Sequence, residues 1–395
     1  MNLTYIIGNG FDLGLGLPTS YKEFLKHYLE NGNTDNVHYS VQKLNEEIEK
    51  DIDNWGDGEV AIGRMDYRRF SRYYDKQCIR LDDPELPNNI LIAYDDIKRS
   101  LYEYIKQCEN LFPAVLSDIE TSRFRTCLVT IYKALPDPVS GGTFYNNAER
   151  IDVNCLNFNY TNTYSKLIGK SGCSSIIKEG NWKASVHFHA PIHVHGEISV
   201  GCWDDIVFGI GSKAQFAHMP KVSESHTIET VYEQIAPNIV KHDKDIILES
   251  EYKEVSRNPI LAAIKVLRES DVIILFGISL SITDGIWLCE IARRALNDDC
   301  VKVIYSPYYL GRVKMNSKPN RWKDYVSNKV REALEDAYGF NGQSEESMIS
   351  RVVRSLHGKI QILRSAPLGY IDEAFPPDCD PLGLSKFNEK LQYHF

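Results

Sequence analysis

The sequence predicts an α/β protein whose core is a doubly wound, mostly parallel, Rossmann-like sheet, covered in part by a helical insert. Short apolar runs alternate with stretches of helical periodicity, as expected when strands and helices alternate along a chain. The run Val272–Phe276 is apolar on both faces, which is typical of a central parallel strand. Near the start, the apolar run Leu3–Ile7 leads into a glycine-rich turn and then a helical pattern, the order of a first strand–turn–helix unit.

Composition and charge indicate an ordinary soluble globular protein. The net charge of -9 does not favour nucleic acid as a partner. No apolar run reaches the length of a membrane span, and the N-terminus lacks the pattern of a signal peptide. The nine cysteines include no C-x-x-C pair, which argues against a disulfide framework and favours a reducing compartment. We therefore expect a cytoplasmic protein with no membrane partner.

The first turn, Gly8-Asn9-Gly10-Phe11-Asp12, is the first candidate for a ligand site. Because glycine lacks a Cβ atom, the backbone there can approach a phosphate or ribose closely, and the N–H groups of the turn can donate to an anion. The glycines at 8, 10, 14 and 16 depart from the spacing G-x-G-x-x-G, so a turn without a ligand is the alternative. Asp12 could contact a ribose hydroxyl or only form the turn.

Residues 32–135 predict a helical insert or cap, because helical periodicity dominates them, most clearly from Ile90 to Cys108. Trp55 and Glu59 stand at a break between helices, from which they could reach over a cleft, although core packing is the plainer interpretation for Trp55. The chain thus divides into a discontinuous core of residues 1–31 and 136–310, the insert 32–135, and a C-terminal helical extension 311–395 with a final strand.

Within the insert, basic residues recur four positions apart with aromatic residues between them: Arg68, Arg72, Lys76 and Arg80. On a helix this spacing predicts one basic face, which could hold a phosphate backbone. The alternative is a solvated face beside an acidic helix, and the overall charge favours it. Nucleic acid is therefore not the expected partner.

Beyond the insert, the period changes to that of strands. Apolar runs predict strands at 153–158, 186–188, 192–194, 206–210, 272–276, 301–305 and 360–363, and helices at 258–269, 318–337 and 345–356. Four of the turns that follow strands carry glycine or polar residues: Gly8–Gly10, Asn159, His195 and Ser279. In a doubly wound sheet such turns meet at the carboxyl edge, where ligands bind. The sequence therefore predicts one ligand site there, although Asn159 could serve only its own turn.

Four histidines alternate along two of these strands, His187 and His189 on the first and His193 and His195 on the second. Alternate histidines can chelate a metal, and imidazole suits zinc. Pro191 separates the pairs, however, and no acidic or cysteine ligand has an obvious spacing. Ordinary strand histidines with one functional member are therefore favoured, and no metal is expected.

The motifs, taken in order, resemble those of one family. They are GNGFD at 8–12 with LPTSY at 17–21, LNFNYTN at 156–162, HGE at 195–197, and GISL at 277–280 with Asp284. This ordered set resembles the AbiH family of bacterial abortive-infection proteins over most of the chain. The resemblance implies a role in bacteriophage defence.

More distantly, the same four motifs resemble those of sirtuin-like domains, in which they build an NAD site. The resemblance implies that Asn159 corresponds to a catalytic asparagine, His195 to a catalytic histidine and Ser279 to a serine on the ribose side. Gly8 and Gly10 fit the glycine loop of those domains. The resemblance therefore implies NAD as a substrate or ligand.

Three features distinguish the chain from the sirtuin-like pattern. Pro18 fits the loop, but Asn9 stands where a small residue is usual, and Thr161 stands where aspartate is usual. The four-cysteine zinc knuckle of the protein-deacylating members is missing. The resemblance thus implies NAD cleavage rather than peptide deacylation.

We predict from this resemblance an anti-phage effector of the NAD glycohydrolase type. Asn159 would orient water and ribose, and His195 would act as general base, since the ordinary pKa of histidine lies near neutrality. The expected contacts to the nucleotide are Gly8, Asn9, Gly10, Phe11, Asp12, Pro18, Thr161, Gly277 and Ser279.

Two alternatives stay open at this point. The cleft could bind a nucleotide or a phage-derived signal without turnover while the insert contacts a protein partner, and Thr161 favours this alternative. The other is a nucleic-acid-directed effector that uses the Arg68–Arg80 face, although no carboxylate cluster for magnesium stands out. A homo-oligomer is compatible with each.

Overall fold

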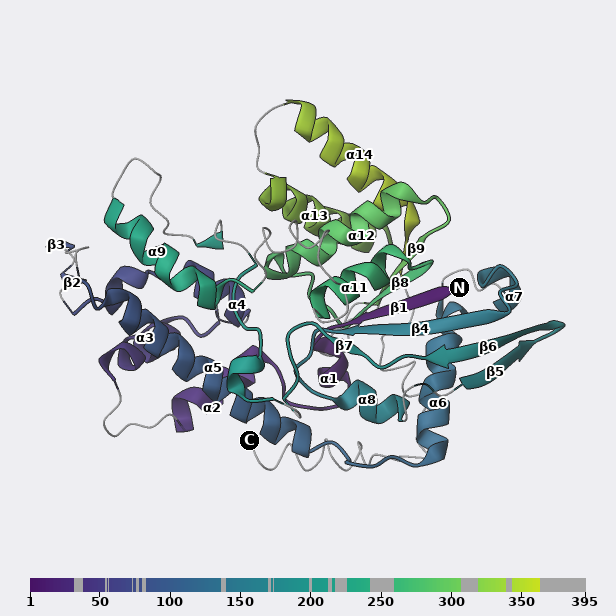
Figure 1. Ribbon diagram of the computed structural model, residues 1–395, viewed down its shortest axis with the longest axis horizontal. Helices are drawn as coiled ribbons and strands as arrows, with labels where there is room; N and C mark the ends of the chain where they lie inside the picture. Colours follow the sequence, from purple (N-terminus) through teal and green to yellow (C-terminus); the bar gives the residue numbers. More distant parts are fainter. Residues whose placement is uncertain are drawn as a thin grey trace.

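The computed structural model describes residues 1–362, except 32–37, 54, 56, 73, 76–77, 80–82, 136–139, 170–171, 173, 199–200, 212–214, 217–225, 242–258, 307–318 and 339–342. Its centre is an eight-stranded sheet in the order β10-β9-β8-β1-β4-β6-β5, in which β7 also pairs with β4 (Figure 1). The strands are β1 (Asn2–Ile7), β4 (Arg150–Asn157), β5 (Ser174–Glu179), β6 (Trp182–Phe188), β7 (Ile192–His193), β8 (Val272–Phe276), β9 (Lys302–Ser306) and β10 (Ile360–Ile362).

The winding of the sheet reverses at its centre. From β1 the chain adds β4 and then β6 on one side, and later returns to add β8, β9 and β10 on the other. All of these pairings are parallel, and only β5 runs antiparallel, to β6. The prediction of a doubly wound, mostly parallel α/β sheet is confirmed. The carboxyl ends of β1 and β8 form the topological switch point, where sheets of this order bind ligands.

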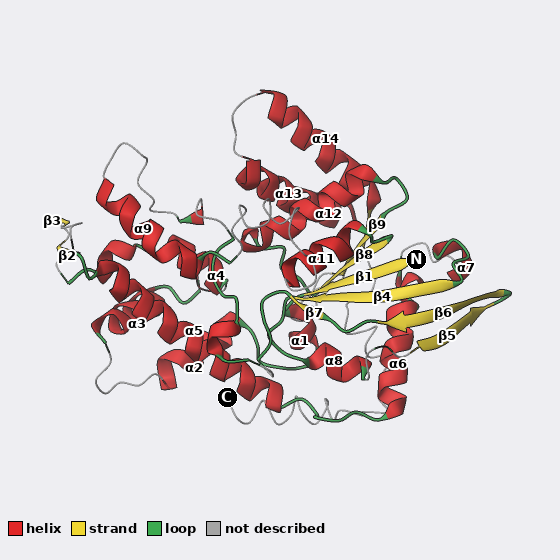
Figure 2. Cartoon of the chain, in the orientation of Figure 1, coloured by secondary structure: helices red, strands yellow, loops and turns green. Residues whose placement is uncertain are grey.

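Helices cover both faces of the sheet because its central strands are apolar on both sides (Figure 2). Along β1, the side chains of Leu3, Tyr5 and Ile7 pack toward one face and Ile6 toward the other, as the two-residue period of a strand requires. The first face is covered by α1 (Gly10–Gly14), α6 (Asp118–Val129), η3 (Ile131–Ala134), α7 (Gly141–Phe144) and α8 (Thr163–Ile168). The second is covered by α11 (Pro259–Arg268), α12 (Gly285–Asn297), α13 (Pro319–Tyr338) and α14 (Gln343–Lys359).

A separate helical layer faces the carboxyl ends of the strands (Figure 1). It has its own apolar cluster, in which Leu44 and Ile97 pack with Phe208 and Ile235. We call this layer the cap; it comprises α2 (Tyr21–Asn31), α3 (Tyr39–Lys50), α4 (Gly58–Arg64), η2 (Tyr67–Phe70), α5 (Leu86–Asn110), η4 (Trp203–Asp205) and α9 (His226–Ile239). None of the helices that the structure describes is long and apolar enough to span a bilayer.

The cap differs in composition from the predicted insert 32–135. Helix α6 lies within that range but packs on the sheet through Phe124 and Leu128. Conversely, the segment that contains Phe208 and α9 packs with the cap although it follows β7 in the chain. The division of the chain into three parts stays a prediction, and residues 363–395 of the C-terminal extension lie outside the described residues.

The basic helix predicted from Arg68 to Arg80 is wrong. Residues Tyr67–Phe70 form a short 3-10 helix, and β2 (Tyr74–Asp75) and β3 (Cys78–Ile79) then pair antiparallel. Arg68 contacts Asp66 across 2.6 Å, and Arg69 forms an ion pair with Glu47. Lys76 and Arg80 lie outside the described residues. The four-residue spacing therefore does not produce one basic face.

The strand predicted at 206–210 is also wrong, although most of the other predicted elements are present. Ile206, Phe208 and Ile210 are buried in the cap, but residues 206–209 belong to no strand, and Ile210 makes only an isolated bridge to Val240. Gly209 has φ +140, and a Cβ atom there would lie 1.9 Å from the carbonyl oxygen of Ile239. The burial of this segment therefore comes from packing in the cap, where the Phe208 ring contacts Tyr21 and Tyr94, and not from a sheet.

Candidate functional site

A cavity of about 1030 Å³ opens at the switch point, between the carboxyl ends of the strands and the cap. Most of the predicted site residues line it: Gly8, Asn9, Gly10, Asp12, Asn159, Thr161, His195, Gly277 and Ser279. Glu59 and Asp57 line it from the cap. Phe11 and Pro18 are not among the lining residues. The sheet thus brings together strand ends that are far apart in the sequence, as expected.

The glycines of the two central loops are explained by contact between their backbones. A Cβ atom on Gly8 would lie 2.6 Å from Ile278 Cα, and one on Gly277 would lie 2.5 Å from the backbone nitrogen of Phe11. The N–H of Gly8 donates to the carbonyl of Phe276 (3.0 Å), and that of Gly10 to the carbonyl of Gly277 (2.7 Å). These two N–H groups are therefore engaged within the protein. What the loop offers to a ligand is close approach of the backbone.

Three of the predicted contact residues serve the loop itself. Asn9 clamps the following turn, because its Nδ2 donates to the carbonyl of Thr19 (2.8 Å) and its Oδ1 accepts from the Thr19 hydroxyl (2.6 Å). Phe11 points into the core, where its ring centroid lies 5.7 Å from that of Phe276. The carbonyl of Pro18 accepts from the Tyr104 hydroxyl (2.6 Å) and so ties the turn to the cap.

Asp12 is buried at the cavity floor and is held by two hydroxyl groups. Thr161 Oγ1 donates to its Oδ2 (2.5 Å) and Thr163 Oγ1 to its Oδ1 (2.6 Å). Burial raises the pKa of Asp12 to about 6, although both hydrogen bonds oppose that rise. Thr161 therefore supplies no carboxylate of its own, but its hydroxyl holds the carboxylate of Asp12, which comes from α1. A contact between Asp12 and ribose stays a prediction.

Asn159 lines the cavity, and the turn that contains it is held by another asparagine. The turn is made by Asn157, whose Oδ1 accepts from the backbone N–H of Asn159 (3.0 Å) and whose Nδ2 donates to the carbonyl of Thr161 (3.1 Å). Asn159 is 4% exposed, and its Nδ2 has no hydrogen-bond partner within the described part of the chain. A buried amide without a partner is costly, so this atom is a candidate for contact with a ligand.

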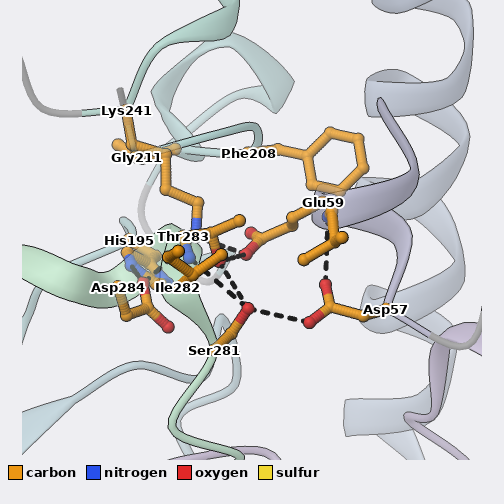
Figure 3. Close-up of polar contacts among 12 residues, drawn as sticks. Asp57, Glu59, His195, Phe208, Gly211, Lys241, Ser281, Ile282, Thr283 and Asp284 are labelled. Carbon is orange, nitrogen blue, oxygen red and sulfur yellow. Dashed lines mark hydrogen bonds and ion pairs between the residues drawn. The ribbon is translucent and has the colours of Figure 1, made fainter. Parts of the chain in front are cut away.

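His195 belongs to a buried network of charged groups that joins the core to the cap (Figure 3). Its Nε2 lies 3.2 Å from Asp284 Oδ1, and Lys241 Nζ lies 3.2 Å from the same oxygen. Lys241, whose side chain is fully buried, also donates to Glu59 from the cap. The hydroxyl of Thr283 donates to the same Glu59 oxygen (3.0 Å). Glu59 thus reaches the cleft, as its position at the break between helices predicts.

The charges in this network are interdependent. Burial alone would raise the pKa of Asp284, but Lys241 and His195 hold it well below its ordinary value. Burial likewise opposes charge on Lys241, but the carboxylates of Asp284 and Glu59 raise the pKa of that amine. For Glu59 burial prevails and raises the pKa. Asp284 is therefore the ionised carboxylate that orients His195, as a carboxylate commonly orients a functional histidine.

Trp55 and the other three histidines have separate surroundings. Trp55 is 5% exposed and packs in the cap core. His187 Nδ1 lies 2.8 Å from the Ser174 hydroxyl, and His189 Nε2 lies 2.9 Å from Asp152. His193 Nε2 lies 3.7 Å from Glu197, and burial lowers its pKa. The alternating histidines therefore do not converge on one point.

Protein purified without added metal is expected to contain no stoichiometric zinc, because the four histidines face different partners. Elemental analysis of the purified protein, together with melting in the presence of a chelator, checks this expectation. Finding about one zinc per chain that is lost in His187→Ala or His193→Ala would contradict it.

Sequence patterns alone miss two members of the network. Lys241 follows an apolar helix and has no motif around it, and Asp57 lies at the break that marks Glu59. In the structure Asp57 accepts from Ser281 Oγ (2.8 Å) and from the backbone N–H of Val60, so it caps α4 and touches the loop after β8 (Figure 3). In the sequence, Asp284 stands out only as part of the motif that also contains GISL at 277–280.

Comparisons with known proteins support the first resemblance. No curated protein and no solved structure matches the chain. One family does match, described as bacteriophage abortive infection AbiH, and its match covers residues 4–306, which is 303 of the 395 residues. Nothing in the comparisons supports the sirtuin-like resemblance, which stays a prediction. The chain therefore belongs to the AbiH family and so to the proteins of bacteriophage abortive infection.

Proposed function

We propose that this AbiH protein acts in phage defence by cleaving the bond between nicotinamide and ribose in NAD, or the corresponding bond of a related nucleotide. The observation that carries the proposal is the placement of His195, oriented by Asp284, in the same cavity as Asn159, whose Nδ2 has no partner among the described residues. Phe158, the residue before Asn159, contacts the His195 ring with centroids 5.1 Å apart.

The position and size of the cavity support a nucleotide ligand. It lies where the winding of the sheet reverses, which is where sheets of this strand order bind dinucleotides. Its volume of about 1030 Å³ lies at the upper end of the range for small-molecule sites. A ligand as large as a dinucleotide can therefore be accommodated.

The proposed reaction needs a base and a stabilised positive charge on ribose. Water attacks the ribose carbon as the bond to nicotinamide breaks, nicotinamide leaves with the bonding electrons, and the proton of water passes to His195. Asp284, which lies 3.2 Å from Nε2, orients the imidazole for this step. The Asn159 amide orients water and ribose. The carboxylates of Asp12 and Asp57, which line the cavity, favour the positive charge that develops.

Binding without turnover is the second candidate, and two contacts favour it. The Thr161 hydroxyl is committed to Asp12, and the N–H groups of Gly8 and Gly10 are committed to backbone carbonyls. In this case the cavity senses a nucleotide or phage-derived signal, and the cap passes the change to a protein partner.

Incubating the purified protein with NAD and measuring free nicotinamide tests the proposal. Gly10→Asp is expected to abolish cleavage, because a carboxylate would repel the diphosphate and a Cβ atom would prevent close approach. Gly10→Ala, the matched control, adds only the Cβ atom and should keep part of the activity, with melting curves to check folding.

Calorimetry with NAD, ADP-ribose and ATP separates the two candidates. If the protein cleaves NAD, wild type releases nicotinamide. If it only senses a nucleotide, wild type binds one and releases no nicotinamide, and Gly10→Asp loses more affinity than Gly10→Ala does. Wild type that neither binds any of the three nor cleaves NAD, even in extracts of infected cells, would overturn both. The glycine loop would then be a structural turn only.

A further inference from the structure

Three aromatic side chains line the cavity on the side of α13, which in the sheet order lies opposite to β7, the strand that precedes His195. They are Tyr305 at the end of β9 and Trp322 and Tyr325 on α13. The ring centroids of Tyr305 and Trp322 are 6.0 Å apart, and those of Trp322 and Tyr325 are 5.7 Å apart. Tyr325 donates its hydroxyl proton to the carbonyl of Ser279 (3.0 Å), which fixes the ring beside the loop after β8. We call these residues the aromatic shelf.

The shelf takes part in docking α13 on the sheet, because Tyr305 is buried in the core and Trp322 and Tyr325 pack against that core, but it is not the whole of that contact. Val326, Val330 and Ala333 of the same helix are buried and make that contact. Trp322 and Tyr325 are only partly buried and present surface to the cavity. Large aromatic faces that stay open to a cavity are suited to stacking with a flat ring.

The distance along the sheet edge suits a ligand with two ends. Strands β8, β1 and β4 stand between β9, which carries Tyr305, and β7, which precedes His195. At about 4.8 Å per strand step, the ends of β9 and β7 lie roughly 19 Å apart. His195 itself contacts Asp284, which follows β8, so a ligand at His195 need not span this full distance to reach the shelf.

Charge supports the same arrangement. Among the described residues that line the cavity, Arg321, next to Trp322, is the sole arginine or lysine, and Asp324 lies on the same helix. The cavity otherwise carries carboxylates, including Asp12, Asp57 and Glu59. A phosphate group is therefore most favoured near Arg321 and the shelf.

We propose that the aromatic shelf is a nucleobase subsite, which stacks the base of the nucleoside monophosphate half that is not cleaved, with Arg321 near its phosphate. For NAD this half is AMP, and the other half lies at Asn159 and His195. The inference rests on the proposed function for this orientation, but the binding of a base to the shelf can be measured without turnover.

The test uses AMP as a probe and follows tryptophan fluorescence and calorimetry. AMP should change the fluorescence of wild type, because Trp322 contacts the base. In Trp322→Phe the signal should disappear while calorimetry still detects binding, since a phenyl ring also stacks. In Trp322→Ala the affinity for AMP should fall about 5- to 150-fold, the fold-change that the loss of one stacked base corresponds to. Trp203→Phe, a tryptophan on the cap outside the cavity lining, is the matched control and should respond like wild type.

The outcomes separate the subsite from the cleavage reaction. If the inference holds and NAD is cleaved, Trp322→Ala should raise KM for NAD by a similar factor and leave kcat within about twofold. An AMP signal that persists in Trp322→Phe, or a folded Trp322→Ala that binds AMP as wild type does, would overturn the subsite. Loss of the AMP signal in Trp322→Phe, combined with no nicotinamide release by wild type, would leave the subsite standing and reject cleavage.

Discussion

Replacing Lys241 with methionine is expected to lower the free energy of unfolding by about 3–5 kcal/mol, the usual cost of removing one partner from a buried ion pair. The side chain of Lys241 is 0% exposed and contacts both Glu59 and Asp284. Without the ammonium group, these two buried carboxylates would lose their shared cation, and among the described residues His195 would be the cationic partner left to Asp284. Urea unfolding, with the slope compared between variants, measures the loss.

The pH dependence of this loss has a definite sign. Burial raises the pKa of Glu59 above its unfolded value, so ionised Glu59 destabilises the fold as the pH rises and needs the charge of Lys241. The penalty of Lys241→Met should therefore shrink toward about pH 5, where Glu59 takes up a proton more readily. Lys329→Met, which removes an exposed contact to Glu332, is the matched control and should stay within about 0.5 kcal/mol of wild type. A loss below about 1 kcal/mol for Lys241→Met would contradict a buried network.

Replacing His195 with alanine is expected to reduce NAD cleavage by about 10²–10⁴-fold, which is the usual contribution of a general base. Asn159→Ala should also abolish activity, because Asn159 lines the cavity and its Nδ2 has no partner among the described residues. Both variants should lose protection in phage plaque assays while keeping the circular dichroism of wild type. Nicotinamide release supplies the direct measurement.

His189→Ala is the matched control for this prediction. It removes an imidazole of the same chemistry that contacts Asp152, is 48% exposed and does not line the cavity. It should cleave NAD and protect cells as wild type does. Folded His195→Ala or Asn159→Ala protein that still protects fully would remove that residue from the mechanism.

The position of the site could be predicted from the sequence because it depends on the strands. The five residues of β8 are all buried, and such an apolar run is visible without a structure. Once the runs that end at Asn159 and Ser279 are assigned to one parallel sheet, their turns must meet at its carboxyl edge. The direction of each side chain, in contrast, could not be predicted from the pattern of strands. Within Asn157-Phe158-Asn159, one asparagine makes the turn and the other lines the cavity with an amide nitrogen that has no partner in the described part of the chain, and the pattern does not distinguish them.

The ion network could not be predicted for a different reason. Lys241 and Glu59 are 182 positions apart, and neither lies at the end of a sheet strand. Their contact depends on how the cap packs, and that packing combines residues from two separate parts of the chain. The four-residue spacing of basic residues from Arg68 predicted a wrong structure for a related reason. Such a spacing places side chains on one face only if the backbone is helical, and here a short 3-10 helix is followed by two paired strands.

Because the cap is built from two separate stretches of the chain, it limits how a chimera of this chain and another AbiH protein can be made. The apolar cluster of the cap joins residues from Phe24 to Cys108 with residues from Ile198 to Ile239, and Lys241 follows directly after. If only the first stretch were replaced by that of a relative, it would have to pack against the second stretch of this chain. The apolar surfaces would then not match, and the carboxylate at position 59 would lack its own lysine. Chimeras should therefore fold only when both stretches, and the lysine with them, are inherited from the same parent.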